Sequence, residues 1–152
     1  MSRAFVNEDT HIDALPDRPV SEHPNLVTSE GLALIEAALE AARRAYAEAQ
    51  AEGDRDHLAS VARDLRYWNA RRATAQVRAS EPAAEVVQFG HTITIERDDG
   101  RRQTYRIVGE DEADPTKGSI SYVSPLARSL LGRRVGDVVR AGRDEAEIVG
   151  IK

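Results

Sequence analysis

Two seams of apolar residues at heptad spacing, separated by a short polar turn, place the strongest constraint on the fold of this chain. The first seam consists of Leu32, Ile35, Leu39, Ala42, Tyr46 and Ala49, and the second of Leu58, Val61, Leu65, Trp68, Arg72 and Ala75. Both repeat at intervals of 3, 4, 3, 4 and 3 residues, which is typical of helices that pack along a narrow stripe. Because only the polar residues 52–56 separate the seams, we expect an antiparallel hairpin with arms of about 20 residues, about 30 Å long.

The ends of this hairpin carry local signals. Thr28 or Ser29 can cap the first helix by accepting a hydrogen bond from a free backbone N–H, and Gly53 can end it. Pro82 is expected to end the helical region. We therefore assign residues 28–79 to an antiparallel coiled-coil hairpin. The alternative is that the two helices are packed elements of an ordinary globular domain.

Beyond Pro82 the apolar pattern changes to a period of two, which indicates strands. Asp98-Asp99-Gly100 is a hairpin-turn signal, and Ser124-Pro125 provides a cap and a first helical residue. Residues 80–152 are therefore expected to form a small antiparallel β domain with one short helix, so the fold class is α+β. The expected strands are residues 86–95, 103–109, 119–123, 135–140 and 146–151, and the expected helix is residues 126–131.

Residues 1–27 are expected to be a disordered tail. Three prolines interrupt the segment, and its five acidic residues outnumber its two basic residues. Its apolar content is too low to offset the entropy of ordering.

The composition excludes several classes of function. The chain has no cysteine, so disulfides and thiolate chemistry are excluded, and its net charge of -5 disfavours binding to duplex DNA by phosphate neutralisation. It has no apolar run of about 20 residues and no apolar signal-peptide core at its start. We therefore expect a cytoplasmic protein that makes no use of a membrane and acts on a protein partner.

Six short sequence blocks lie between residues 105 and 139, and together they are more informative than any one of them alone. They read Tyr-Arg-Ile-Val-Gly, Asp-Glu-Ala-Asp, Ile-Ser, Ser-Pro-Leu-Ala-Arg, Leu-Leu-Gly and Gly-Asp-Val-Val. This region resembles the C-terminal domain of the bacterial GreA/GreB transcript-cleavage factors. The start of the chain and the segment Val27-Thr28-Ser29-Glu30-Gly31 resemble those of GreB-type factors. The resemblance implies an FKBP-like fold for residues 80–152.

The resemblance also implies a function. Factors of this family bind bacterial RNA polymerase through the C-terminal domain and insert the hairpin into the secondary channel. Acidic residues at the hairpin tip then help the polymerase to cleave its own backtracked RNA, so the factor is not an enzyme by itself. The partners implied are RNA polymerase and, indirectly, the 3′ end of the nascent RNA. No cofactor is implied for the free protein, and Mg²⁺ only within the polymerase complex.

The implied tip residues match the family pattern only in part. Asp54 takes the first acidic position and is the implied Mg²⁺ ligand shared with the polymerase, whereas His57 stands where the family has glutamate. Asp56 can substitute for the second acid, although both aspartates also suit a solvated turn with helix-capping acids. Nearby basic residues of the second helix suit either a solvated face or a position near the RNA 3′ end. These are Arg63, Arg66, Arg71, Arg72 and Arg78.

The resemblance places the polymerase contact on Asp111, Glu112 and Asp114, and on Ser124, Pro125 and Arg128. The hairpin is about two helical turns, or about 12 Å, shorter than the family standard. A Gre-like or Rnk-like regulator that occupies the channel without stimulating cleavage is therefore the alternative. A prolyl isomerase is a third possibility that rests on the fold alone, and few aromatic residues are present to line its pocket.

Overall fold

A computed structural model describes residues 15–82 and 84–152 of the chain, which fall into two compact units. Unit 1 comprises Met1–Glu22 and Ala33–Ala75, of which the described part begins at residue 15, and unit 2 comprises His23–Leu32 and Gln76–Lys152. Residues 23–32 and 76–79 therefore lie in unit 2, whereas the sequence pattern assigned residues 23–27 to the tail and residues 28–32 and 76–79 to the hairpin. Within the described ranges, no helix combines the length and the hydropathy needed to cross a membrane.

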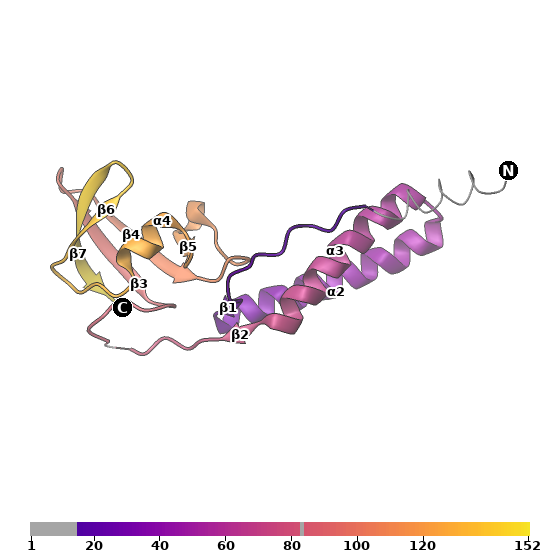
Figure 1. Ribbon diagram of the computed structural model, residues 1–152, viewed down its shortest axis with the longest axis horizontal. Coiled ribbons are helices and arrows are strands. Elements are labelled where there is room, and N and C mark those ends of the chain that lie inside the picture. Colours follow the sequence, from indigo (N-terminus) through magenta and orange to yellow (C-terminus); the bar gives the residue numbers. More distant parts are fainter. Residues whose placement is uncertain (1–14, 83) are drawn as a thin grey trace. The chain divides into compact units, whose positions relative to one another are not determined.

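The two expected helices form the hairpin (Figure 1). Helix α2 spans Ser29–Glu52 and helix α3 spans Arg55–Thr74. The hydroxyl of Thr28 accepts a hydrogen bond of 3.0 Å from the Gly31 N–H and so caps α2. Gly53 ends α2 with a φ of +72°, a backbone conformation that favours glycine. Helix α3 ends at Thr74, eight residues before the proline that was expected to end it.

The first apolar seam is the better buried of the two. Ile35, Leu39, Ala42 and Ala49 are buried, and Leu32 and Tyr46 are half-buried. In the second seam only Val61 is buried, with a relative exposure of 8%.

The expectation that Arg72 occupies the second seam is wrong. Arg72 is exposed and forms an ion pair of 3.1 Å with Glu36 on α2, because a charged group is more stable in water beside the seam than within it. The neighbouring Arg71 is buried instead, with a relative exposure of 1%.

Part of the segment expected to be a disordered tail makes defined contacts. Residues 15–22 run beside α3, where Arg18 pairs with Asp64 at 3.1 Å and Asp17 pairs with Arg66 at 2.6 Å (Figure 1). Residues 26–27 form strand β1, Leu26–Val27, which pairs in parallel with β2, Gln76–Val77. The remainder of the expected tail, residues 1–14, lies outside the described residues.

Unit 2 contains a five-stranded sheet with the order β5-β4-β3-β7-β6. The four pairings include three antiparallel ones, but β5 runs parallel to β4, which differs from the all-antiparallel sheet expected from sequence. A 3₁₀ helix, Pro115–Lys117, and the helix α4, Pro125–Leu130, complete the unit. The strands are β3, Thr92–Arg97; β4, Arg102–Val108; β5, Ser119–Ser121; β6, Val138–Ala141; and β7, Asp144–Ile151. The expected order of hairpin followed by a sheet with one short helix is confirmed.

The core of unit 2 is formed by one face of the sheet together with α4. Its most buried members are branched aliphatic residues of the central strands, with Ala127 and Leu130 from α4. Ser124 caps α4 by accepting a hydrogen bond from the Ala127 N–H, and Gly132 follows the helix with a φ of +81°. The cap that the sequence indicated at Ser124 is therefore confirmed.

The first strand of the sheet begins at Thr92, six residues later than the alternating pattern suggested. A turn precedes it, in which Gly90 has a φ of +89° and the His91 N–H donates to the Gln88 carbonyl. The buried His91 ring accepts from the Gln88 N–H at 2.9 Å through Nδ1, so its Nε2–H donates to the Glu81 carbonyl at 2.8 Å. The His91 ring therefore holds this turn together.

Candidate functional site

The hairpin tip is a two-residue connection, Gly53 and Asp54, that leaves its acidic side chains in solvent. Asp54 is the N-cap of α3, and its Oδ1 accepts a hydrogen bond of 3.2 Å from the His57 N–H. Its other carboxylate oxygen has no recorded partner among the described residues. Asp56 lies in the first turn of α3 and is exposed. The sequence reading of Asp54 as a helix cap is therefore correct, and one of its oxygens stays open to a ligand.

The charges at the tip are mixed but predominantly acidic. Glu52, Asp54 and Asp56 lie within five residues of one another, with Arg55 and His57 beside them. Negative charge in the first turn of a helix is favoured by the helix dipole, which explains why two acids are tolerated here. Across residues 15–82 and 84–152, no three acidic, histidine or cysteine side chains are grouped closely enough to hold a metal ion. The tip thus presents exposed carboxylate oxygens to solvent.

In unit 2, the two segments expected to contact a partner leave the same end of the sheet. Strands β4 and β5 are parallel, and Val108 pairs with Ser121. The segments that follow them, residues 109–114 and 122–125, therefore begin at one edge. The sequence alone gave no indication that the two blocks are neighbours, because the parallel pairing was not predicted.

Glu112 has an internal role that the sequence did not reveal. Its carboxylate accepts hydrogen bonds from the Thr28 N–H at 3.0 Å, from the Thr28 hydroxyl, and from the Gly109 N–H at 3.3 Å. The same hydroxyl caps α2, so Glu112 fixes the cap residue of that helix. A methyl group on Gly31 would lie 1.9 Å from Glu112 Oε2. Gly109 allows a similarly close approach, since a side chain there would meet the Leu26 carbonyl at 2.4 Å.

The other expected contact residues differ in how far they are engaged within the fold. Asp114 caps the 3₁₀ helix, and hydrogen bonds from Thr116 are the main cause that holds the pKa of the Asp114 carboxyl below its usual value. Ser124 is the cap of α4 and Pro125 is its exposed first residue. Arg128 is exposed. Asp111 is half-buried and has a partner of its own within the protein.

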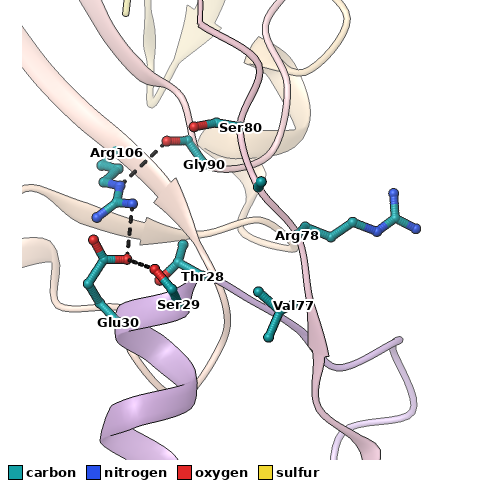
Figure 2. A pocket seen from close by; sticks show the side chains of 9 residues that line it. Thr28, Ser29, Glu30, Val77, Arg78, Ser80, Gly90 and Arg106 are labelled. Carbon is teal, nitrogen blue, oxygen red and sulfur yellow. Dashed lines mark hydrogen bonds and ion pairs between the residues drawn. The ribbon is translucent and has the colours of Figure 1, made fainter.

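A hollow of about 280 Å³ lies at the start of α2, within unit 2. Figure 2 shows that Arg106 reaches between Glu30 and the Gly90 carbonyl, at 3.5 Å and 3.4 Å, whereas the Arg78 guanidinium points away from the hollow. The pKa of Glu30 is lowered by hydrogen bonds from its own backbone N–H and the Ser29 hydroxyl, and by the charge of Arg106. Glu30 therefore balances the charge of Arg106 at this hollow.

Thus Asp54 and Asp56 lie together at the tip in unit 1, whereas the six expected contact residues belong to two neighbouring segments of unit 2. Sequence reasoning missed Thr28, Gly31 and Gly109 as partners of Glu112. The one feature of the sequence that pointed to these contacts was that the Val27–Gly31 segment and the Asp111–Asp114 block both resemble the same family.

Comparison with known proteins places the chain in a family. The family model described as "Transcription elongation factor, GreA/GreB, C-term" matches residues 81–152. A solved structure, the GreA factor homolog 1 (Gfh1) of Thermus thermophilus, is 23% identical with a TM-score of 0.43, over 86% of this chain and 99% of that one. A transcription elongation factor GreB from Neisseria meningitidis serogroup B is 41% identical over 101 residues, which are 62% of each chain.

A transcription elongation factor GreA from Desulfovibrio desulfuricans is similar over a greater length. It is 35% identical over 149 residues, an alignment that covers 88% of this chain and 92% of the relative. A likeness of this extent includes both the helical hairpin and the sheet domain. The chain therefore belongs to the GreA/GreB family of transcription elongation factors.

Proposed function

We propose that this protein binds bacterial RNA polymerase through unit 2, inserts its hairpin into the secondary channel and promotes cleavage of backtracked RNA by the polymerase. In this proposal the protein is an accessory factor that acts in the cytoplasm, and the hydrolytic site belongs to the polymerase. Family membership supports the general role. The tip geometry supports the specific one.

The observation that carries the proposal is the state of Asp54. The residue sits on a two-residue turn, is exposed, and uses one carboxylate oxygen to cap α3 while the other has no recorded partner in the described chain. A cap fixes the direction in which the free oxygen points, so this carboxylate is held in place rather than rotating freely. Asp56, exposed in the first turn of α3, adds a second negative charge nearby.

The tip fits a shared Mg²⁺ ion rather than one of its own. Mg²⁺ prefers oxygen ligands and retains several waters, so one or two carboxylates are a sufficient contribution from a single partner. When bound in the polymerase, such an ion lowers the pKa of a water molecule and stabilises charge on the leaving oxygen. Asp54 would contribute one oxygen, and Asp56 would add negative charge. His57 is a poor substitute for the second acid, since imidazole is not a preferred ligand of Mg²⁺.

The polymerase contact is proposed for the end of the sheet from which residues 109–114 and 122–125 emerge, together with Arg128. Arg128 and Pro125 are exposed and free to meet a partner, whereas the carboxylate of Glu112 is occupied by Thr28 and Gly109. Glu112 is therefore assigned a supporting role in which it fixes the segment that carries Asp111 and Asp114. Arg128→Glu should weaken binding to polymerase without loss of fold, and unchanged affinity would remove Arg128 from the contact.

A second function, occupancy of the channel without cleavage, is favoured by two observations. One is His57 in place of an acid. The other is the length of the hairpin, which from the sequence is expected to be about two helical turns shorter than the family standard. A shorter hairpin reaches less far.

The two functions are separated by a cleavage assay on a stalled, backtracked complex of polymerase, DNA and RNA. We expect the wild-type protein to shorten the RNA, and His57→Glu to increase the rate by adding an oxygen ligand. If both proteins bind the complex and neither shortens the RNA, reach rather than chemistry is limiting, and the occupancy function is the correct one.

A further inference from the structure

The side chain of Arg18 lies in a small site on the surface of α3. Its guanidinium carbon is 4.0 Å from the centroid of the Tyr67 ring and 5.9 Å from that of Trp68, and its Nη1 is 3.1 Å from Asp64 Oδ1. The two rings meet edge to face, with centroids 5.0 Å apart. A planar cation over an aromatic face with a carboxylate at its side is a favourable arrangement for arginine.

Residues 15–22, which we call the strap, carry Arg18 to this site. Pro16 and Pro19 flank the Asp17-Arg18 pair and disfavour a helix. A second ion pair sets the position of the strap along α3. Arg66 Nε is 2.6 Å from Asp17 Oδ1, and Arg66 Nη2 is 3.4 Å from the Leu15 carbonyl. The strap and the site belong to the same unit.

The two ion pairs that hold the strap are accessible to water. The side chains of Arg18 and Asp64 are 38% and 43% exposed, and those of Arg66 and Asp17 are 46% and 71% exposed. The apolar residues of the strap contribute little burial, because Leu15 and Val20 are both exposed. Exposed ion pairs are weak and are screened by salt, so the strap can be displaced without unfolding the hairpin.

We propose that Asp64, Tyr67 and Trp68 form a binding site for an arginine side chain, which Arg18 fills in the free protein and which an arginine-bearing segment of a protein partner takes over by displacing the strap. The strap is then a self-inhibitory contact, since the partner must compete with a ligand tethered to the same chain. The effective affinity of the partner is lowered by the fraction of time that the strap is closed.

The chemistry of the site favours an arginine over a nucleic acid. Asp64 lies beside the rings on α3 itself, so a phosphate that took the place of Arg18 would meet negative charge there. The edge-to-face arrangement of Tyr67 and Trp68 also offers no pair of parallel surfaces on which consecutive bases could stack. A guanidinium satisfies the carboxylate and covers a ring at once, as Arg18 does.

The experiment uses the full chain and its single tryptophan, Trp68, as a local reporter. Three proteins are compared: the wild type, Arg18→Gln, and a matched control, Arg44→Gln, which removes an exposed arginine that pairs with Glu40 on α2. Each is titrated with the peptide Leu-Pro-Asp-Arg-Pro-Val-Ser-Glu and with the same peptide carrying alanine for arginine. The readout is the position of the Trp68 indole N–H resonance.

We expect the resonance to shift in Arg18→Gln but not in Arg44→Gln, and the arginine peptide to return it toward the wild-type position. The peptide should bind Arg18→Gln about ten-fold more tightly than it binds the wild type or the control. This factor corresponds to a strap that is closed about 90% of the time in the wild type, so that only about a tenth of the molecules have an open site. Asp64→Asn combined with Arg18→Gln should abolish that binding.

Three results would overturn the proposal: equal effects of the arginine and alanine peptides, equal affinity of the wild type and Arg18→Gln, or displacement by a single-stranded oligouridylate that matches the arginine peptide. Far-ultraviolet circular dichroism of each variant verifies that the helices are retained. A loss of helix in Arg18→Gln would also contradict the proposal, because the strap would then be required for the fold rather than displaceable.

Discussion

The contact between Gly31 and Glu112 predicts that one substitution has opposite effects on stability in two backgrounds. In the wild type, a methyl group at Gly31 would lie 1.9 Å from Glu112 Oε2 and 2.5 Å from its carboxyl carbon. All three nearest atoms to that methyl belong to Glu112. Gly31→Ala must therefore push the carboxylate away from Thr28 and Gly109.

The size of each effect follows from the contacts that are lost. Hydrogen bonds to a charged acceptor contribute about 1.5–3 kcal/mol each, and water can replace part of this because the loop is half-exposed. We therefore expect Gly31→Ala to lower the free energy of unfolding by about 2–3 kcal/mol. In Glu112→Ala the obstruction is absent, and alanine is the better helix former by roughly 0.5–1 kcal/mol. The same substitution should then be stabilising.

The assay is urea-induced unfolding of the four proteins of this double-mutant cycle, followed by circular dichroism. Amide exchange at Thr28 and Gly109 should increase in all three variants, since each loses or moves the carboxylate. Glu145→Ala, which removes an exposed acid on β7, is the control and should change stability by less than about 0.5 kcal/mol. The reasoning is refuted if Gly31→Ala has the same sign and size in both backgrounds, since the two residues would then act independently.

Three further predictions concern the hairpin and the 3₁₀ helix. Leu39→Ala should lower the free energy of unfolding of the hairpin by about 2–4 kcal/mol and Leu34→Ala by much less, because Leu39 is 5% exposed and Leu34 is 41% exposed; equal effects in urea unfolding would contradict the seam. Gly53→Ala should cost about 1–2 kcal/mol in the same assay, because alanine is strained at a φ of +72°; an unchanged midpoint would exclude that strain. Removing the Thr116 hydroxyl by Thr116→Val should raise the pKa of Asp114 toward its ordinary value, as measured by carboxyl NMR titration. The lowered pKa of Asp114 contributes stability above its unfolded-state pKa that is lost as the pH falls through the folded one, so the variant should lose less stability on acidification.

Local chemistry in the sequence was sufficient to predict several helix and turn positions. Ser124 and Pro125 begin α4, Gly53 ends α2, and the Asp98–Gly100 turn joins β3 to β4, with the Gly100 N–H donating to the Arg97 carbonyl at 2.9 Å. In each case a few adjacent residues determine the backbone conformation, so no distant partner needs to be known. The seam of α2 was predictable for the same reason, because helical spacing alone places its residues on one face.

The features that the sequence did not predict depend on residues far apart in the chain. Glu112 binds Thr28 across 84 positions, and Arg18 binds Asp64 across 46. The parallel pairing of β4 with β5 likewise requires knowledge of how the intervening loop returns. The strap was not predicted because a proline-rich acidic segment is typical of disorder. Its order depends on Asp64, Tyr67 and Trp68, which lie together on α3 and bind Arg18.

The central claim, that Asp54 contributes to cleavage of RNA within the polymerase, is tested most directly by comparing the wild type with Asp54→Asn. Asparagine is an equally good helix cap, so the substitution keeps the His57 N–H partner and removes only the charge. The measurement is the rate of shortening of RNA in a backtracked complex at saturating factor, over a range of Mg²⁺ concentrations. The account predicts cleavage with the wild type, a rate lower by roughly ten-fold or more with Asp54→Asn, and nearly equal affinity of both proteins for the polymerase. Equal rates for the two proteins, or a wild type that binds and never shortens the RNA at any Mg²⁺ concentration, would contradict it.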